Sequence, residues 1–287
     1  MRVLIVGGTG LLGSNLRNSL TRNGHEVVVT SRQPDAEDKS MLLVNLENIA
    51  ESLQAIRSAG KFDVVVLSAG VSSIRACKNN PKTSSQINVD AQVSIAQDQI
   101  SRDSPKVVLI STNRIFDGSS KLVSPNAPHN PTTIYGDQKS QAERQLVALG
   151  DSIKIVRFSK VISEHSELVV DWYHKLLRGD TVSAFVDVAI SPITVDSAVC
   201  VIERVVLEES KAVTQYSATD EISFFEMASL IASYAKAPAT NVLEQLAKDV
   251  GDNAVAHSSL ESTVFSSIKP MSSLQSVRHV MEKITKS

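Results

Sequence analysis

A glycine-rich segment follows a short apolar run at the very start of the chain. Residues 3–6 are Val-Leu-Ile-Val, and residues 7–13 read Gly-Gly-Thr-Gly-Leu-Leu-Gly. Two overlapping glycine spacings are present, Gly8-x-Gly10-x-x-Gly13 and Gly7-x-x-Gly10-x-x-Gly13. Glycines at these spacings permit a tight strand-to-helix turn, in which the backbone approaches a pyrophosphate at the helix N-terminus. The sequence therefore predicts a dinucleotide site in the first β-α-β unit.

Short β-branched runs alternate with helix-period segments through the first half of the chain. The runs are continuously apolar, which is typical of strands buried on both faces of a parallel sheet. The alternation predicts an α/β fold with a Rossmann-like, doubly wound parallel sheet. We expect strands at 3–6, 27–29, 41–44, 64–67, 107–110 and 153–156, and helices at 13–23, 50–59, 89–101 and 140–149.

The second half of the chain is less regular. Helices are expected at 168–177, 195–208, 224–234 and near the C-terminus. Three prolines in residues 124–131 remove backbone donors, so this stretch should be a surface loop, either a plain connector or a lid over a substrate. We predict a dinucleotide-binding domain at 1–160, completed by about 188–215, and a smaller substrate-binding region at 161–187 and 216–287.

The residues after the second predicted strand bear on which dinucleotide binds. NAD enzymes carry an acid there for the ribose 2′-hydroxyl, whereas an arginine suits the extra phosphate of NADP. This chain has Thr30-Ser31-Arg32 and no acid before Asp35, so NADP(H) is preferred over NAD(H). Small residues that end the fourth strand would let the backbone lie near the cofactor. The candidate cofactor-binding residues are Gly7, Gly10, Leu11, Leu12, Gly13, Ser31, Arg32, Ser68, Ala69 and Gly70.

A tyrosine and a lysine stand four residues apart in Tyr135-Gly-Asp-Gln-Lys139, on one face of a helical turn. A phenol has an ordinary pKa of about 10, and a neighbouring cation should lower it toward neutrality, as general acid work requires. The preceding strand ends in Ser111-Thr112, whose hydroxyls should emerge at the carboxyl edge of the sheet, where ligands of this fold bind. Thr112, Tyr135 and Lys139 are the candidate catalytic residues.

Composition excludes several other functions. The net charge of −2, with scattered Lys and Arg, gives no basic face for a nucleic acid. No apolar run approaches the roughly 20 residues of a membrane span. Cys77 and Cys200 lack close partners, the six histidines have no metal-binding spacing, and no G-x-S-x-G elbow is present. We expect a reduced, cytoplasmic protein without metal or acyl-transfer chemistry.

Taken in order, these motifs make the chain resemble the extended short-chain dehydrogenases/reductases, and among them the dTDP-4-dehydrorhamnose reductase branch of sugar-nucleotide reductases. The resemblance covers nearly the whole chain. It rests on the glycine loop, Asn79 and Pro81 before Ile87-Asn88-Val89, Ser111-Thr112 with Phe116-Asp117-Gly118, Asn130-Pro131, Tyr135-Gly136 with Lys139 and Ala142-Glu143, Val156-Arg157, Ser191-Pro192 with Asp196, and Lys269-Pro270 before Ser273-Leu274.

The resemblance implies NADPH-dependent reduction of a keto group on a nucleotide-linked sugar. Tyr135 would protonate the forming alkoxide, and Thr112 would orient the carbonyl. Lys139 would lower the tyrosine pKa and hold the nicotinamide ribose. Asn88 would support the catalytic helix, and it joins Tyr135 and Lys139 among the residues near the cofactor. The cofactor supplies the hydride, and the protein supplies orientation and the proton.

Two segments depart from the pattern of this branch. Where the branch has Asp-Tyr after Ser-Thr, this chain has Asn113-Arg114. Where the branch has Val-Asp-x-Ala-Glu, this chain has Ile-Arg-Ala-Cys-Lys at residues 74–78. The usual sugar is therefore in doubt, and Arg75, Asn113 and Arg114 are candidate substrate contacts. The added arginines suit a more anionic ligand, because guanidinium pairs with carboxylate or phosphate. The related dehydratases carry Asp-Glu after the threonine, so elimination is disfavoured here.

Two other functions stay open at this point. The same branch resembles an NADP-binding regulatory subunit of methionine adenosyltransferase, which would be non-catalytic. A sugar-nucleotide epimerase uses the same residues with a tightly held cofactor. The sequence leaves the substrate and the reaction direction undetermined, and a homodimer is one assembly it permits.

Overall fold

A computed structural model describes residues 1–35, 37–250 and 255–286 of the chain, which form two compact units. Unit 1 comprises Met1–Asp117, Pro128–Arg157 and Val199–Thr214. Unit 2 comprises Gly118–Ala127, Phe158–Ala198 and Gln215–Ser287. Each unit is therefore assembled from segments that lie far apart in the sequence.

A seven-stranded sheet forms the centre of unit 1, with strand order β11-β6-β5-β4-β1-β2-β3. The pairings of β1 with β2 and β4, of β2 with β3 and of β4 with β5 are parallel. Strand order reverses between β1 and β4, which confirms the doubly wound fold and marks the point where such sheets bind ligands. The strands are β1 (Arg2–Val6), β2 (Glu26–Ser31), β3 (Met41–Leu43), β4 (Val64–Leu67), β5 (Lys106–Thr112), β6 (Ile153–Phe158) and β11 (Val213–Tyr216).

Six of these strands coincide with the predicted runs, because strands buried on both faces are continuously apolar. β11 was not predicted, since Val-Thr-Gln-Tyr is short and half polar. The core of unit 1 includes Leu4, Leu67, Leu109 and Ile155 from the strands, all buried.

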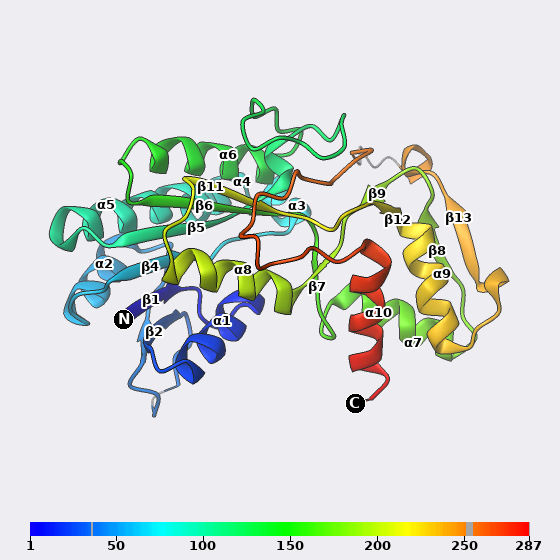
Figure 1. Cartoon of the computed structure of the whole chain (residues 1–287), viewed down its shortest axis with the longest axis horizontal. Helices are drawn as coiled ribbons and strands as arrows, with labels where there is room; N and C mark the ends of the chain where they lie inside the picture. The colour runs from blue at the N-terminus through cyan, green and yellow to red at the C-terminus, as the bar shows by residue number, and fades with distance from the viewer. Residues whose placement is uncertain (36, 251–254, 287) are drawn as a thin grey trace. The chain divides into compact units, whose positions relative to one another are not determined.

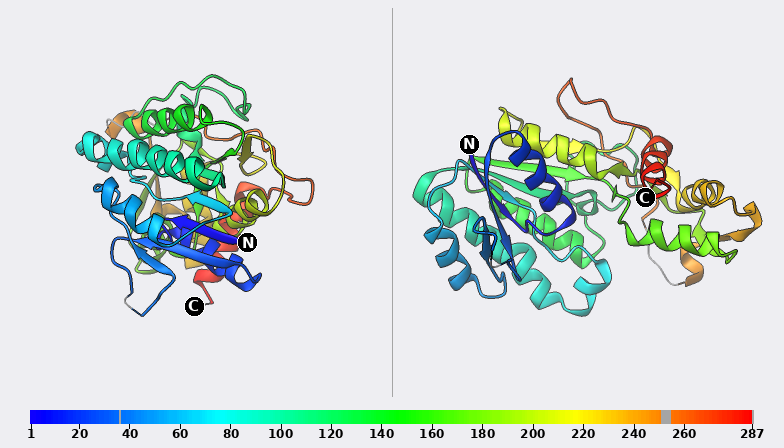
Figure 2. Two further views of the ribbon diagram at one scale, coloured as in Figure 1. Left: turned by 90° about the vertical axis from the view of Figure 1, so that its left-hand side faces the viewer. Right: turned by 90° about the horizontal axis from the view of Figure 1, so that it is seen from below.

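Helices cover both faces of this sheet. Figures 1 and 2 show α2 (Ile49–Ser58), α5 (Ala91–Asp103) and α6 (Ile134–Val147) along one face, and α1 (Leu11–Arg22) with α8 (Val195–Leu207) along the other. The predicted helices are confirmed, and α6 also contains the helical turn expected at 135–139, so it begins six residues before the predicted range 140–149. The Thr133 hydroxyl accepts a hydrogen bond from the Gly136 N–H at 3.0 Å and caps the helix at its observed start. Short helical elements that were not predicted are α3 (Ile74–Asn79), α4 (Pro81–Ser85), the π-helical η1 (Gln86–Asp90) and the 3₁₀-helical η2 (Asn113–Ile115).

Unit 2 is mainly helical, with a core that includes Trp172, Met227, Ile231 and Val280. Its helices α7 (Glu167–Leu177), α9 (Phe224–Ala235) and α10 (Ser273–Ile284) match the expected positions. Three two-stranded sheets pair β7 (Val161–Ile162) with β10 (Ile193–Thr194), β9 (Ala189–Ile190) with β12 (Ile222–Ser223), and β8 (Val182–Phe185) with β13 (Val242–Gln245). Two 3₁₀ turns are η3 (Ala239–Asn241) and η4 (Ala247–Val250). Residues 124–131 form no helix or strand, as their prolines predict.

Candidate active site

The glycine loop joins β1 to α1, and most of its glycines are required by close backbone approach. Gly7 has φ +91°, and a Cβ there would lie 2.7 Å from the backbone of Ala69. A Cβ at Gly13 would overlap the carbonyl of Gly7. Gly10 is different, because a Cβ there would meet nothing nearer than the Gly7 carbonyl oxygen at 3.5 Å. The fold therefore tolerates a side chain at this helix N-cap, and the open space suits an approaching phosphate.

A cavity of about 260 Å³ lies beside the loop at the carboxyl ends of β2 and β4. It brings together seven predicted cofactor residues: Gly7, Gly10, Ser31, Arg32, Ser68, Ala69 and Gly70. Leu11, Leu12 and Gly13 lie at the start of α1 but do not line it, and neither do Asn88, Tyr135 and Lys139. Sequence reasoning missed the other lining residues, which are Thr9, Thr30, Val44, Asn45, Leu46, Val71 and Ile87.

Several of the missed residues stand at or directly after strand ends. Val44, Asn45 and Leu46 follow β3, and Val71 lies just beyond β4. The rule that ligands bind at the carboxyl edge, applied to every predicted strand, would have found them. Thr30 also holds the loop in place, since its Oγ1 accepts a hydrogen bond from the Gly7 N–H at 2.9 Å.

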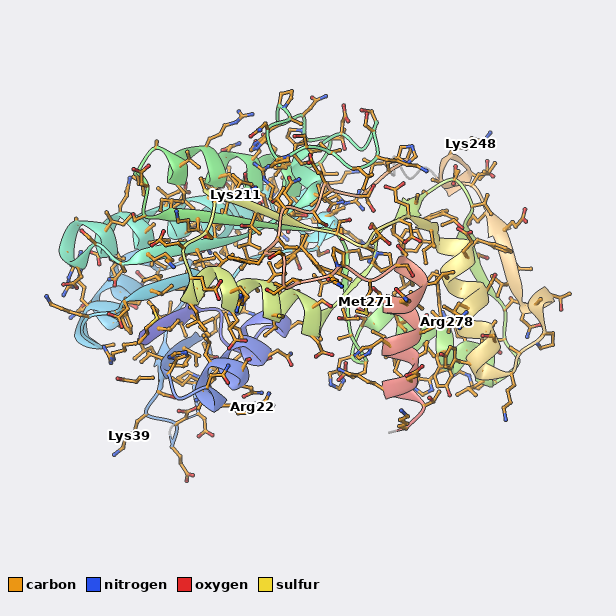
Figure 3. The ribbon with its side chains drawn as sticks, viewed as in Figure 1. Arg22, Lys39, Lys211, Lys248, Met271 and Arg278 are labelled. Atoms are coloured by element: carbon orange, nitrogen blue, oxygen red, sulfur yellow. The ribbon has the colours of Figure 1, made fainter. Side chains whose placement is uncertain are left out.

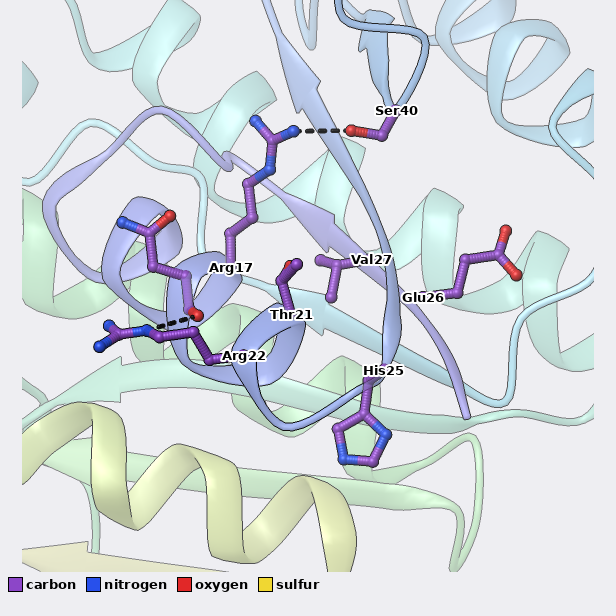
Figure 4. A pocket seen from close by; sticks show the side chains of 8 residues that line it. Arg17, Thr21, Arg22, His25, Glu26, Val27 and Ser40 are labelled. Carbon is purple, nitrogen blue, oxygen red and sulfur yellow. Dashed lines mark hydrogen bonds between the residues drawn. The ribbon is translucent and has the colours of Figure 1, made fainter.

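A larger hollow of about 680 Å³ contains none of the predicted site residues (Figure 4). It lies along the C-terminal part of α1 and the beginning of β2, at the sheet edge opposite to the glycine loop. Figure 3 shows Arg22, one of its lining residues, at the end of α1. Arg17 lines it as well, but its guanidinium is already paired with Asp38 at 2.5 Å. The smaller cavity beside the glycine loop is therefore the better candidate cofactor site.

The three predicted catalytic residues come together where β5 meets α6. Thr112 is the last residue of β5, and Tyr135 and Lys139 lie one turn apart at the beginning of α6. A Cβ on Gly136 would overlap the carbonyl of Arg114, so η2 and α6 are in close backbone contact there. The Thr112 hydroxyl lies close enough to the Tyr135 phenol to act on its pKa.

The expectation that Lys139 lowers the tyrosine pKa is wrong for this structure. Burial raises the pKa of Tyr135 to about 12, while the Thr112 hydrogen bond and the Arg114 charge act in the opposite direction. The Lys139 ammonium instead donates to the carbonyl of Ile110 at 2.7 Å. Burial lowers the pKa of Lys139 to about 8, against the attraction of Glu143. The phenol thus stays protonated at neutral pH, which is the state a proton donor needs.

Asn88 joins the end of β4 to α6. Its amide nitrogen donates to Gln138 Oε1 at 2.8 Å and to the Val71 carbonyl at 3.0 Å, and its Oδ1 accepts from the Val71 N–H at 2.8 Å. A Cβ on Gly70 would lie 2.9 Å from the same Oδ1. Asn88 therefore contacts both the helix that carries Tyr135 and a segment that lines the cavity.

The three candidate substrate residues differ in their surroundings. Asn113 is buried and Arg114 half-buried in η2, directly after Thr112. The Arg114 N–H donates to Thr112 Oγ1 at 3.2 Å, and the Arg114 charge acts on Tyr135. Arg75 is exposed in the first turn of α3. Of the two added arginines, Arg114 is the one whose charge acts on a candidate catalytic side chain, that of Tyr135.

Within residues 1–35, 37–250 and 255–286, no helix is long and apolar enough to cross a membrane. Nor do those ranges contain a cluster of three or more His, Cys, Asp or Glu side chains that could hold a metal ion. Cys77 is buried and Cys200 exposed, and both are free thiols.

Comparison with known proteins extends over most of the chain. Residues 1–280 match the model of a family described as RmlD substrate binding domain. A dTDP-4-dehydrorhamnose reductase from Aggregatibacter actinomycetemcomitans is 25% identical over 256 residues, which cover 85% of this chain and 82% of that protein. Methionine adenosyltransferase 2 subunit beta from Danio rerio is 22% identical over 264 residues, covering 88% of this chain and 80% of that protein.

The fold is shared with solved structures. A dTDP-4-dehydrorhamnose reductase from Bacillus anthracis, solved in complex with NADP, superimposes with a TM-score of 0.86 at 20% identity. The match covers 98% of this chain and 99% of the other. The match therefore includes residues of both units.

Proposed function

Because the chain belongs to the RmlD substrate binding domain family, within the extended short-chain dehydrogenases/reductases, we propose that it is an NADPH-dependent reductase of a keto group on a nucleotide-linked sugar. The observation that carries the proposal is the convergence of Thr112, Tyr135 and Lys139 at the carboxyl end of β5, in the same unit as the glycine loop. The likeness to the reductase from Aggregatibacter actinomycetemcomitans supports this assignment. We assign cofactor binding and chemistry to unit 1 and substrate recognition to unit 2.

The side chains of this site are arranged to deliver a proton. The bound cofactor would supply the hydride. Thr112 would hold the substrate carbonyl through its hydroxyl, and Tyr135 would donate its phenolic proton to the oxygen as the alkoxide forms. The phenolate left behind is stabilised by the Arg114 charge, which acts to lower the Tyr135 pKa.

The residues of the cavity favour NADP(H). Arg32 is exposed and lines the cavity, and the neighbouring Thr30 and Ser31 are neutral. A guanidinium there would pair with a 2′-phosphate, whereas the described residues that line the cavity include no carboxylate for a ribose 2′-hydroxyl. Arg32→Ala should weaken NADPH binding by about tenfold, or 1.4 kcal/mol, and leave NADH binding unchanged. Equal losses for both cofactors would contradict the preference.

The direct test of the function is NADPH consumption with a panel of nucleotide-linked keto sugars. The wild-type protein should oxidise NADPH with at least one of them. Tyr135→Phe should reduce kcat by about 10²–10⁴-fold and leave NADP(H) affinity unchanged, because only the proton donor is lost. Turnover that survives in Tyr135→Phe would remove Tyr135 from the chemistry.

A regulatory role is the second candidate, because the Danio rerio methionine adenosyltransferase subunit matches most of the chain. NADP binding without turnover on any sugar of the panel, together with co-purification of a methionine adenosyltransferase, would establish it. Retention of the nucleotide through purification would instead indicate an epimerase.

We further propose a cytoplasmic location and a nucleotide-sugar ligand, and size-exclusion chromatography would test for a homodimer.

A further inference from the structure

A buried carboxylate lies one turn beyond Lys139 on α6. The Glu143 side chain is 2% exposed, and burying a charge costs free energy unless it is paired and hydrogen-bonded. The Ser111 hydroxyl donates to its Oε1 at 2.5 Å. Arg157 donates from Nη2 to Oε2 at 2.7 Å and from Nε to both oxygens at 3.2 and 3.1 Å. Glu143 thus joins α6 to β5 and β6 through side chains alone.

His129 connects Arg157 to Ser140, the residue that follows Lys139 on α6. Its Nε2 lies 2.9 Å from Arg157 Nη2, and its Nδ1 lies 2.9 Å from Ser140 Oγ. A guanidinium has no acceptor, so Nε2 must accept and Nδ1 must carry the proton and donate to Ser140. Burial lowers the pKa of His129, which agrees with this neutral tautomer. We call Ser111, His129, Ser140, Glu143 and Arg157 the Glu143 network.

The Glu143 network adjoins the catalytic residues on both elements. Ser111 precedes Thr112 on β5, and Ser140 follows Lys139 on α6. The Lys139 ammonium bonds the Ile110 carbonyl, so two consecutive β5 residues, Ile110 and Ser111, are held by α6 side chains one turn apart. The distance between the Thr112 hydroxyl and the Tyr135 phenol depends on this alignment of strand and helix.

We propose that Glu143 is a positioning residue that aligns Thr112 on β5 with Tyr135 and Lys139 on α6. This inference rests on the proposed function, since it assigns Glu143 a part in the same reaction. The attraction of Glu143 opposes the burial that lowers the pKa of Lys139. Arg114 in η2 and Cys77 on α3 act on Tyr135, and Glu143 acts on Lys139. The charged groups that act on His129 are Glu143 and Arg144 on α6 and Arg157 on β6.

The test variant is Glu143→Gln, which keeps the length of the side chain and removes its charge. We expect kcat to fall by about 10–100-fold through misalignment, with NADPH affinity unchanged. The alkaline limb of the pH–rate profile should move to lower pH, because Lys139 loses its proton more readily. Glu143→Asp should restore part of kcat and move the limb back.

A matched control is Asp98→Asn, which removes another arginine-paired carboxylate of unit 1. The Asp98 carboxylate on α5 accepts hydrogen bonds from Nε and Nη2 of Arg57 on α2, away from the catalytic residues. Its kcat and pH profile should equal those of the wild type. If Glu143→Gln does not fold, Ser111→Ala removes only the contact to β5 and should lower kcat at unchanged NADPH affinity. A wild-type kcat and pH profile in the folded Glu143→Gln, or a wild-type kcat in Ser111→Ala, would overturn the proposal.

A substrate-free measurement separates this inference from the function it rests on. The Lys139 amine can be titrated by NMR in protein labelled with ¹³C-lysine, with Lys139→Arg to assign its signal. The wild-type pKa should be about 8 and that of Glu143→Gln lower. A wild type without turnover removes the proposed function, whereas an unchanged Lys139 titration in Glu143→Gln overturns the role of Glu143.

Discussion

Two buried glutamates, one in each unit, use their carboxylates differently. The side chain of Glu143 in unit 1 is 2% exposed, and that of Glu221 in unit 2 is 3% exposed. Glu143 is held by the side chains of Ser111 and Arg157. Glu221 accepts from the backbone N–H groups of residues 258 and 259 at 2.8 and 2.7 Å, and pairs with His257 Nδ1 at 2.8 Å.

The difference lies in what each carboxylate fixes. A carboxylate bound by backbone N–H groups determines the course of a loop, which here is the segment around residues 257–259. The same segment bonds residue 118 through the His257 N–H and residue 122 through the Ser259 hydroxyl. A carboxylate bound by side chains determines how those side chains lie relative to one another. Loss of Glu221 should therefore affect the stability of the fold, and loss of Glu143 should affect the reaction.

The largest expected effect comes from replacing Lys139, the buried cation nearest in sequence to Glu143. Lys139→Met should lower kcat by about 10²–10⁴-fold. It should also raise the free energy of unfolding by about 2–3 kcal/mol at pH 7, because a lysine whose pKa falls from 10.5 to about 8 is costly to keep charged. Turnover assays and urea unfolding would measure both effects.

Lys106 offers a matched control for that variant. It is also partly buried with a lowered pKa, but it donates to the carbonyls of Val205, Val206 and Glu208 at the end of α8. Lys106→Met should lose stability and keep wild-type kcat. A Lys139→Met protein that loses stability instead would show that the ammonium serves the fold.

Glu221→Gln tests the other side of the comparison. Removing the charge weakens the bonds from residues 258 and 259, so the free energy of unfolding should fall by about 2 kcal/mol. The kcat of the folded protein should stay within about twofold of wild type. Urea unfolding and turnover, measured beside Glu143→Gln, would separate the two glutamates. A fall in the kcat of Glu221→Gln without a change in its stability would show that the two glutamates have the same kind of role.

Gly10→Ala tests whether the cofactor or the fold requires the open space at the N-cap of α1. Because φ is −75° and nothing lies within 3.5 Å of a new Cβ, stability should change by less than about 1 kcal/mol. NADPH affinity should fall by about tenfold, since the methyl group occupies the phosphate approach. Fluorescence titration and thermal unfolding would measure these quantities. Gly13→Ala, which clashes with the Gly7 carbonyl, should destabilise the protein in the same assays.

The smallest expected effect is a pH dependence that differs between the two units. Burial lowers the pKa of His129 from 6.5, so its neutral form stabilises unit 1 above pH 6.5, and this contribution is lost as the pH falls below that value. Hydrogen bonds lower the pKa of Glu221 from 4.5 against its burial, so its contribution is present above pH 4.5 and lost at lower pH. The free energy of unfolding, measured from pH 7 to pH 4, should show the loss of the His129 contribution. His129→Gln should abolish this loss.

The sequence predicted the sheet of unit 1 better than the small strands of unit 2. Buried parallel strands are continuously apolar, whereas pairs such as β9 and β12 are too short to carry a pattern. Apolar periodicity alone placed the start of α6 at residue 140, because its first turn contains Gly136 and Asp137, whereas the spacing of Tyr135 and Lys139 indicated the earlier turn. Gly136 is there because the Arg114 carbonyl packs against it, a contact that spacing cannot reveal.

The sequence indicated which residues of the candidate site lie together, but it did not predict their electrostatics. Thr112, Tyr135 and Lys139 converge because strand ends and helix starts of this fold meet at one edge. The direction of the Tyr135 pKa was wrong, since burial outweighs the neighbouring charges and depends on packing from distant segments. Glu143 and Arg157 were recognised as motif residues, but their pairing with Ser111 joins three elements and needed the structure.

The division of unit 1 into separate chain segments has a consequence for its synthesis. β11 borders β6 at the edge of the sheet, yet residues 158–198 of unit 2 emerge from the ribosome between them. A fragment ending at residue 157 would lack β11 and α8, leaving β6 as a bare edge strand and one sheet face partly uncovered. Such a fragment should aggregate rather than fold, so unit 1 cannot be completed until most of the chain has been translated.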